Sequence, residues 1–312
     1  MHELLVIGVD GGGTKTLAWV AGEDARPLGE ATGPASAVIP GAERHSADVI
    51  AQVVRDALRS AEREHIRPRA LCAGLAGVGR AAQRNALLSA LESMDLADDV
   101  IVRADAAVAM DDAFDEGPGI LLIAGTGSVA FGRGPTGAEA RAGGWGPVCG
   151  DEGSGAWIGR RALSVVTAAH DGREPETALT GALLTVAEVN DVDDLVPWAA
   201  LATPAQLATL APVVAAVADA GDLRANAVLS LAAEELVLHV RALARRLFVD
   251  ERAGIPVALS GGLLAPGGPL RRRVEHRLRS AVPGSQLRAE AVVPVRGAVR
   301  DALALAGMGD RD

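Results

Sequence analysis

Apolar and polar positions follow one arrangement that occurs twice along this chain. Apolar runs at residues 4–9 and 17–21 flank a polar, glycine-rich stretch, which predicts a strand, a tight turn and a second strand. The same arrangement returns at residues 119–124 and 129–131. The repetition indicates two units built on the same local plan.

Segments with helical periodicity lie between and after these runs. In residues 46–65 apolar side chains recur at the spacing of three and four that places them on one face of a helix. Asp105 stands directly before another such segment, which ends near residue 114. Further helices are predicted at residues 83–94, 153–170, 204–220, 223–249, 269–280 and 296–306, and further strands at 70–75, 99–103 and 256–259. Because helices interleave with strands, the predicted fold class is α/β.

Pro118 lies directly before the second copy of the strand–turn–strand arrangement, and proline commonly separates elements. We therefore expect two domains, residues 1–117 and 118–312. The last predicted helix is a candidate to pack back on the first domain. A chain of 312 residues is long enough for two domains of ordinary size.

Composition and charge exclude several classes of partner. The net charge of -10 disfavours a nucleic-acid backbone, and there is no polybasic run for a membrane surface. No apolar stretch reaches the roughly 20 residues that span a bilayer, and the first residues lack the basic segment and cleavage site of a signal peptide. Cys72 and Cys149 provide neither a disulfide framework nor a four-ligand zinc site. We therefore expect a cytoplasmic protein without nucleic-acid or membrane partners.

Three glycine turns follow predicted strands, at residues 10–13, 125–128 and 260–262. Glycine lets the backbone approach an anion closely, and successive N–H groups at a strand end form a nest that binds phosphate. The alternative is that these glycines only make tight turns. This explanation becomes less convincing with each further glycine turn that follows a strand. The pattern therefore predicts a ligand with phosphate groups.

Two common phosphate motifs do not fit these turns. Gly8 and Gly13 have the spacing of a P-loop, but Thr14 and Lys15 stand where that motif requires Lys-Ser/Thr, and an apolar strand follows instead of a helix. Residues 125–130, GTGSVA, match the dinucleotide fingerprint, but a predicted strand follows where that motif opens a helix. What remains is a pair of β-hairpins with Gly/Thr/Ser tips, one in each predicted domain, which we expect to face each other.

Taken in order, the segments resemble the actin-like sugar kinase and ATPase superfamily, and most strongly its N-acetylglucosamine kinase branch, which is grouped with the BadF/BadG/BcrA/BcrD ATPases. The segments that are similar are DGGGTKT at 10–16 (first phosphate loop), ADAA at 104–107 (catalytic aspartate), GTGS at 125–128 (second phosphate loop), GGWGPVCGDEGS at 143–154 (sugar-binding segment) and SGG at 260–262 (adenosine loop). The likeness spans nearly the whole chain. It implies an α/β fold of two actin-like (ribonuclease-H-like) domains with an interdomain cleft.

Phosphoryl transfer needs positioned phosphates, neutralised charge and an acceptor for the proton of the attacking hydroxyl. The resemblance implies that Asp105 is this general base and that Asp10 holds Mg²⁺ through water. The residues alone favour a helix N-cap for Asp105, and Lys15 is equally well an ordinary solvated lysine. The residues implied in ATP binding are Gly12, Gly13, Thr14, Lys15, Thr126, Gly127, Ala211, Gly221, Gly261, Gly262 and Leu264.

The resemblance also implies a set of sugar-binding residues: Ser36, Ala37, Asp105, Ser128, Val129, Gly143, Gly144, Trp145, Gly146 and Asp151. Asp151 would accept hydrogen bonds from two sugar hydroxyls, because an ionised carboxylate is a strong acceptor. Glu152 is expected to complement the start of the helix that follows. Two positions depart from the family: Ala37 replaces an asparagine, with Ser36 as a partial substitute, and Val129 replaces a residue that is often polar.

The activity implied is ATP-dependent phosphorylation of N-acetylglucosamine or glucosamine to its 6-phosphate, with ATP and Mg²⁺ as cofactors and a homodimer as the assembly. One alternative is an activator of a 2-hydroxyacyl-CoA dehydratase, in which a cysteine pair from each subunit bridges an iron–sulfur cluster. Another is a non-catalytic ATP-binding regulator. Cys72 and Cys149 are far apart in the sequence, which disfavours the activator. The presence of Asp10, Asp105 and Asp151 together disfavours the regulator.

Overall fold

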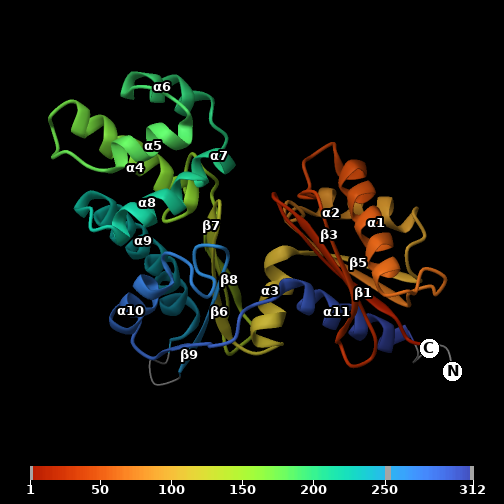
Figure 1. The fold of residues 1–312 in the computed structure, drawn as a ribbon. Helices are drawn as coiled ribbons and strands as arrows, with labels where there is room; N and C mark the ends of the chain where they lie inside the picture. Colours follow the sequence, from red (N-terminus) through yellow and green to blue (C-terminus); the bar gives the residue numbers. More distant parts are fainter. Residues whose placement is uncertain (1–2, 250–253, 310–312) are drawn as a thin grey trace. The chain divides into compact units, whose positions relative to one another are not determined.

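The computed structural model of the chain describes residues 3–249 and 254–309. Helices interleave with strands, so the predicted α/β class is confirmed. The chain divides into two compact units: unit 1 is Met1–Glu116 with Val292–Asp312, and unit 2 is Gly117–Ala291. Each unit is built around one five-stranded sheet (Figure 1).

The sheet of unit 1 has the strand order β3-β2-β1-β4-β5. β1, β2 and β3 are antiparallel neighbours, whereas β1, β4 and β5 run parallel. The strands are β1 Val6–Gly11, β2 Thr16–Ala21, β3 Pro27–Gly33, β4 Ala70–Leu75 and β5 Asp99–Ala104. Because parallel strands share a direction, the carboxyl ends of β1, β4 and β5 meet at one edge of the sheet.

The two faces of this sheet are covered by different helices. Successive side chains of a strand point to opposite faces, so Ile7 and Val9 pack with α1 and α2, whereas Val6 packs with α3 and α11. A Cβ added at Gly8 would lie 2.6 Å from the carbonyl oxygen of Val295, so only glycine lets α11 lie this close to β1. The helices are α1 Glu43–Ser60, α2 Ala81–Glu92, α3 Asp105–Phe114 and α11 Pro294–Gly309.

A buried carboxylate fastens α11 to α3. The side chain of Asp112 on α3 is fully buried, and it accepts a hydrogen bond of 2.5 Å from Nε of Arg296 and one of 2.7 Å from the N–H of Val293. A buried carboxylate is tolerated only when it is paired and hydrogen-bonded. The C-terminal helix is therefore an integral layer of unit 1.

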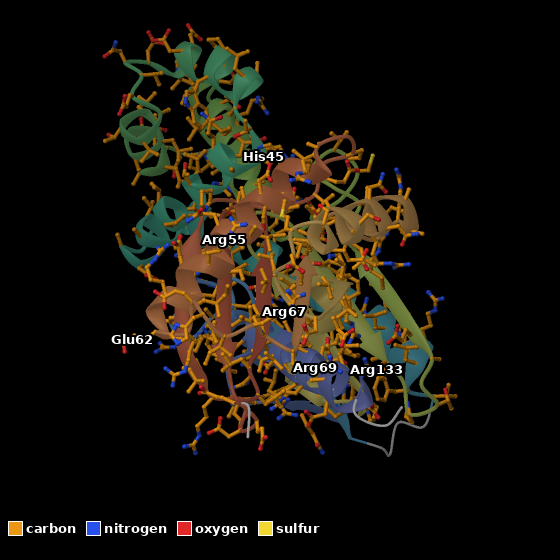
Figure 2. All side chains as sticks on the ribbon, turned by 90° about the vertical axis from the view of Figure 1, so that its right-hand side faces the viewer. His45, Arg55, Glu62, Arg67, Arg69 and Arg133 are labelled. Atoms are coloured by element: carbon orange, nitrogen blue, oxygen red, sulfur yellow. The ribbon has the colours of Figure 1, made fainter. Side chains whose placement is uncertain are left out.

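Ion pairs gather at the amino ends of β4 and β5, around Arg67 and Arg69, whose positions Figure 2 shows. Arg67 contacts Asp95 at 2.7 Å and Asp98 at 2.5 Å, and Arg69 contacts Asp98 and Asp99. These side chains are partly exposed to solvent, where ion pairs contribute little to stability. The edge with these pairs is opposite to the carboxyl edge, where the predicted site residues of unit 1 lie.

Unit 2 repeats this sheet plan with the strand order β10-β9-β6-β7-β8. β6, β7 and β8 are antiparallel neighbours, and β9 and β10 continue the sheet in parallel with β6. The strands are β6 Gly119–Ala124, β7 Ser128–Arg133, β8 Glu139–Gly143, β9 Ile255–Ser260 and β10 Ser285–Leu287. The central hairpin β6–β7 corresponds to β1–β2, as the repeated sequence arrangement predicts.

The helices of unit 2 are α4 Gly155–His170, α5 Leu179–Ala187, α6 Val192–Leu201, α7 Pro204–Ala208, α8 Leu210–Asp219, α9 Leu223–Leu247 and α10 Arg271–Ala281. The long helix α9 packs on β6, β7 and β8 and against α8 and α10. Buried leucine, valine and alanine side chains from one face of α9 join the core of unit 2.

Several predicted elements need correction. The helix predicted over residues 204–220 is two helices, because Pro212 has no N–H to bond back to residue 208. The helix predicted from residue 153 begins at Gly155, behind Ser154, whose Oγ accepts a hydrogen bond from the N–H of Trp157. The sequence pattern missed β3, β8, β10, α5 and α6. Within the described ranges, no helix has the length and apolar character needed to cross a membrane.

Candidate functional site

The turn between β1 and β2 forms the first predicted phosphate loop. A hydrogen bond of 3.0 Å from the N–H of Gly12 to the carbonyl of Lys15 closes it, and Gly13, Thr14 and Lys15 are exposed. A Cβ added at Gly12 or Gly13 would meet no protein atom within 4 Å. The packing of the protein therefore does not require glycine at either position, and the space beside this backbone is open.

Two predicted site carboxylates lie close together in unit 1. Asp10 is near the end of β1, and Asp105 follows β5 as the first residue of α3, so both lie at the carboxyl edge of the sheet. Burial, and then the negative charge of Asp105, raise the pKa of Asp10 to about 6, whereas the positive charge of Lys15 lowers it. Burial also raises the pKa of Asp105, against the hydrogen bond that its Oδ1 accepts from the N–H of Ala106 at 2.8 Å.

Asp105 is not the N-cap of α3, in contrast to the reading that the residues alone favour. The cap position is Ala104, which makes no side-chain cap bond. A capping carboxylate accepts from an N–H two or three residues ahead, whereas Asp105 accepts from the adjacent N–H of Ala106. Its carboxylate is therefore not committed to closing the helix.

Ser36 and Ala37 lie beside the first phosphate loop, and their N–H groups both bond to the carbonyl of Gly12, at 3.2 and 3.1 Å. The hydroxyls of Ser36 and Thr16 are 2.7 Å apart, and Thr16 Oγ1 donates to the carbonyl of Pro34 at 2.6 Å. Ser36 is only 2% exposed. The expectation that Ser36 contacts the sugar needs correction, because its hydroxyl is buried against Thr16. Thr16 is a supporting residue that the sequence did not single out.

The turn between β6 and β7 forms the second predicted phosphate loop. Thr126 at its tip is exposed, and a Cβ added at Gly125 would meet nothing within 4 Å. The loop is joined to the start of α4, because the N–H of Gly155 donates to the carbonyl of Gly125 at 2.8 Å and the N–H of Ala156 to that of Thr126 at 3.2 Å. The first turn of α4 and the phosphate loop are therefore one hydrogen-bonded structure.

Residues 143–153, named here the sugar loop, lie against the same hairpin. The N–H of Gly144 donates to the carbonyl of Ser128 at 3.0 Å, and Ser128 Oγ donates to the carbonyl of Glu152 at 2.7 Å. The carboxylate of Asp151 lies so close to Gly127 that a Cβ there would be 2.9 Å from its Oδ2. Asp151 has a φ of +58°, an uncommon backbone conformation for a residue other than glycine. The sugar loop thus places this carboxylate directly beside the second phosphate loop.

Other predicted sugar-loop and hairpin residues differ in their exposure. Trp145 is 69% exposed, and the guanidinium of Arg141 lies 4.9 Å from the centre of its ring. Gly146 has open space beside it and Val129 is half-buried. Ser128 is only 2% exposed, and its Oγ already donates its proton to the carbonyl of Glu152, so it has no proton to donate to a sugar. The expectation that Ser128 is a sugar-binding residue therefore needs correction in one respect, because its side chain cannot act as a donor to the sugar.

Glu152 also departs from its expected role. The cap of α4 is Ser154, and no acidic side chain lies in the first turn of this helix. The carboxylate of Glu152 points instead toward His239 on α9, with 4.0 Å between Oε2 and Nε2.

The predicted adenosine-binding residues divide into open and buried positions. Gly221 and Gly262 are exposed, with no protein atom within 4 Å of an added Cβ, and the half-buried Gly261 lies against Ala124 of β6 with a φ of +88°. Ala211 is 1% exposed and Leu264 is fully buried. The expectation that these two contact ATP needs correction, because both belong to the core of unit 2.

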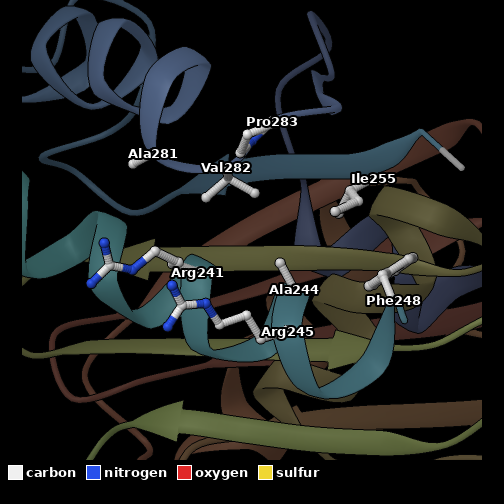
Figure 3. Close-up of a pocket in the computed structure, with 8 residues that line it drawn as sticks. All are labelled: Arg241, Ala244, Arg245, Phe248, Ile255, Ala281, Val282 and Pro283. Carbon is white, nitrogen blue, oxygen red and sulfur yellow. The ribbon is translucent and has the colours of Figure 1, made fainter. Parts of the chain in front are cut away.

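A cavity of about 160 Å³ lies at the C-terminal ends of α9 and α10 (Figure 3). It is lined by Arg241, Ala244, Arg245, Phe248, Ile255, Ala281, Val282 and Pro283. None of these is a predicted site residue. Arg245 lies in the last turn of α9, where a guanidinium complements the partial negative charge of the last carbonyls. A wider surface hollow of about 540 Å³ borders the sugar loop and includes Glu152.

Residues 7–304 match the family model of the BadF/BadG/BcrA/BcrD ATPase family. The chain belongs to this family. The N-acetylmuramic acid/N-acetylglucosamine kinase of Clostridium acetobutylicum is 30% identical to it over 83% of this chain and 85% of the relative. The N-acetyl-D-glucosamine kinase of Dictyostelium discoideum is 28% identical over 97% of this chain and 99% of the relative.

A crystal structure from Chromobacterium violaceum, of a protein provisionally described as an N-acetylglucosamine kinase, aligns with a TM-score of 0.80 and 32% identity. The alignment covers 96% of this chain and 98% of that chain. The family resemblance of the sequence motifs is therefore confirmed, and so is a fold of two actin-like domains. The chain, as a member of the BadF/BadG/BcrA/BcrD ATPase family, therefore carries its glycine turns on the fold of an ATPase family.

Proposed function

We propose that this chain is an ATP-dependent amino-sugar kinase, which transfers the γ-phosphoryl group of ATP to the 6-hydroxyl of N-acetylglucosamine or glucosamine. The similar proteins named above are kinases of N-acetylated amino sugars by their names, which supports this class of substrate. The observation that carries the proposal is the pair Asp10 and Asp105 at the carboxyl edge of the unit 1 sheet, beside an open glycine turn.

Asp105 is the general base of the proposed reaction. A base in phosphoryl transfer accepts the proton of the attacking hydroxyl, and its efficiency rises as its pKa approaches the working pH. Burial raises the pKa of Asp105 above the usual 3.8, and its carboxylate is not used as a helix cap. Both properties suit a group that takes up a proton and later releases it.

Asp10 fits a Mg²⁺ ion that is held mainly by water and phosphate. Mg²⁺ prefers carboxylate oxygens and commonly takes only one or two of them. Asp10 is partly buried beside the exposed turn; burial, and then the negative charge of Asp105, raise its pKa, and the positive charge of Lys15 opposes them. When bound, the ion would neutralise charge on the phosphates.

The glycine turns are the proposed phosphate contacts. At Gly12, Gly13 and Gly125, neither protein packing nor a positive φ explains why glycine is present. Close approach of a phosphate to the backbone is a sufficient reason. Thr14 and Thr126, both exposed at the tips of their hairpins, would add hydroxyl donors.

The sugar loop is the proposed acceptor site. Asp151 offers two oxygens to neighbouring hydroxyls from a position beside Gly127 of the second phosphate loop. Gly146 has open space beside it, and the ring of Trp145 provides an exposed apolar surface. These groups would suit a ligand with several hydroxyls, such as a sugar.

The cysteines argue against the dehydratase-activator alternative. Cys72 is fully buried among the residues that pack β1 and β4 against α11, and burial raises the pKa of its thiol. Cys149 is exposed in unit 2. An iron–sulfur cluster shared between subunits needs accessible thiolates, and this chain has one exposed cysteine.

The test is a panel of sugars with ATP and Mg²⁺. ADP release is measured with N-acetylglucosamine, glucosamine, N-acetylmuramic acid and glucose, and the position of the phosphate in the product is determined by NMR. We expect sugar-dependent ADP release with N-acetylglucosamine or glucosamine and a 6-phosphate product. ADP release that no sugar stimulates would overturn the proposal, and a preference for glucose would overturn the amino-sugar assignment.

A further inference from the structure

One face of α9 supports both ends of the sugar loop. Ala232, Leu236 and His239 are separated by three or four residues, so they share a side of the helix. A Cβ added at Gly153 would lie 2.5 Å from the carbonyl oxygen of Ala232 and 2.6 Å from Cγ of Leu236. A Cβ added at Gly143 would lie 2.8 Å from Nε2 of His239. The first and last residues of the sugar loop therefore rest directly on α9.

The His239 side chain has an unusual environment. It is 12% exposed, and its Nε2 is buried without a hydrogen-bond partner. The carboxylate of Glu152 is 4.0 Å away, just beyond hydrogen-bond distance. No hydrogen bond to the Glu152 carboxylate is recorded among the described residues. A buried polar atom without a partner is rare and calls for a reason.

The charges of two carboxylates act on this imidazole. Burial lowers the pKa of His239, and the charges of Glu152 and Asp151 oppose that shift. On α9, burial raises the pKa of Glu235, and the charges of Glu152 and Glu234 raise it further. Because a neutral imidazole has one N–H, it can give that proton to only one of these carboxylates. Glu152 is the one whose oxygen lies within 4.0 Å of Nε2.

We propose that His239 is a positioning residue for the sugar loop, and that its Nε2–H donates to the carboxylate of Glu152 when the loop holds a sugar. The inference rests on the proposed function, since it assigns a partner to the same acceptor site. The backbone of Glu152 is already fixed by the bond from Ser128 Oγ to its carbonyl. A side-chain rotation of Glu152 is therefore enough to bring the two groups into contact.

This bond would act on the sugar through Asp151. Asp151 directly precedes Glu152 and has an uncommon positive φ, so its carboxylate keeps its direction only while the neighbouring backbone is held. Ser128 holds that backbone from the side of the hairpin, and His239 would hold the side chain of Glu152 from the side of α9. With both in place, the two oxygens of Asp151 stay aimed at the sugar hydroxyls.

The competing explanation is that His239 only fills space under Gly143. Two substitutions separate the explanations. His239→Phe keeps a planar ring of similar size but removes the donor, whereas His239→Gln keeps an N–H donor at a similar reach but packs less well. A space-filling role predicts that Phe is tolerated better than Gln, and a donor role predicts the reverse order.

The first measurement uses the protein without ligands. The side-chain resonances of His239 are followed by NMR through a pH titration, in the wild type and in Glu152→Gln. Removal of the Glu152 charge should lower the pKa of His239 further, because that charge opposes the effect of burial. An unchanged His239 pKa would show that the two groups do not interact in solution and would overturn the inference. This result does not depend on whether the chain is a sugar kinase.

The second measurement is the KM for the sugar and for ATP, with thermal unfolding to check that each variant folds. We expect His239→Phe to raise the sugar KM about tenfold, the effect of losing one hydrogen bond to a charged group, with the ATP KM within about twofold. His239→Gln should stay within about threefold of the wild type. A Phe variant with normal sugar KM, or a parallel rise in ATP KM, would overturn the inference. A wild type without sugar-dependent turnover would instead count against the proposed function.

Discussion

Ser128 Oγ donates a hydrogen bond of 2.7 Å to the backbone carbonyl of Glu152, and it thereby joins the second phosphate loop to the sugar loop. The same hairpin receives the N–H of Gly144 at the carbonyl of Ser128 and the N–H of Gly155 at the carbonyl of Gly125. Within unit 2, the predicted phosphate and sugar contacts are therefore parts of one hydrogen-bonded body.

Ser128→Ala should consequently affect both substrates. Loss of the bond leaves the carbonyl of Glu152 without its partner, which destabilises the protein by about 1 kcal/mol. We expect the KM values for sugar and ATP to rise together, each by about threefold to tenfold. Ser164→Ala, which removes an exposed hydroxyl bonded to the carbonyl of Arg160 within α4, is the matched control and should change neither KM. A rise in the sugar KM alone would show that Ser128 binds sugar directly.

Asp105→Asn tests the proposed general base. The amide keeps the size of the side chain and its bond to the N–H of Ala106, but it cannot take up a proton. We expect kcat to fall by about 10²–10⁴, with ATP affinity measured by calorimetry unchanged. Asp48→Asn, an exposed position on α1, is the control and should leave kcat unaffected. Turnover in Asp105→Asn close to that of the wild type would refute the assignment.

Lys15 is the only lysine in a chain whose other basic residues, apart from six histidines, are all arginine. It is exposed in the first phosphate loop, and its positive charge lowers the pKa of Asp10. If the ammonium group contacts phosphate, Lys15→Ala should raise the ATP KM about tenfold or more and leave the sugar KM unchanged. Arg26→Ala, an exposed cation at the other end of β2, serves as the control. Equal ATP KM values in the two variants would show that Lys15 is an ordinary solvated lysine.

Asp222→Ala should weaken unit 2 through the start of α9. The carboxylate accepts four hydrogen bonds of 2.9 Å, from the N–H groups of Arg224, Ala225 and Ala178 and from Thr177 Oγ1. We expect a loss of about 1–2 kcal/mol in the free energy of unfolding at pH 7. The control is Asp191→Ala, which removes an N-cap that accepts one hydrogen bond, from the N–H of Asp194. We expect it to lower the free energy of unfolding by less.

The pH dependence of that difference follows from the pKa of Asp222. Burial opposes ionisation, but the hydrogen bonds outweigh it and hold the pKa below its usual 3.8. A lowered folded-state pKa gives stability that is present above 3.8 and is lost as the pH falls through the folded value. Urea unfolding at several pH values should therefore show wild type and Asp222→Ala converging below pH 3.8. A gap that widens with acid would contradict this account.

The elements that could be predicted from the sequence are those determined by residues close together in the chain. Apolar runs predict β1, β2, β6 and β7, and the glycine turns between them need only adjacent residues. The edge strands β3 and β8 were missed because their sequences, PLGEATG and EARAG, contain few apolar residues and no fully buried one. A strand of this kind is defined by the partner it pairs with, which local patterning does not show.

The errors in the candidate site have a related cause. Ala211 and Leu264 were assigned to ATP from their motif positions, but each faces the core of unit 2. Ser36 was assigned to the sugar, but it lies under Gly11, a residue 25 positions earlier. His239 was not singled out, because a lone histidine in a helix gives no signal until the loop above it is known. Side-chain direction depends on contacts distant in sequence, whereas the type of chemistry is evident from local motifs.

The place of α11 in unit 1 has a consequence for the order in which the chain can fold during synthesis. The sheet face formed by Val6, Ala70 and Cys72 is covered by α11, and Asp112 finds its guanidinium partner there. On the ribosome, residues 117–291 are added before that helix exists, which takes roughly 9–35 s at about 5–20 residues per second. During that interval the nascent unit 1 has an uncovered apolar face and an unpaired carboxylate. Because α11 is synthesised after unit 2, unit 2 can complete its hydrophobic core before unit 1 does.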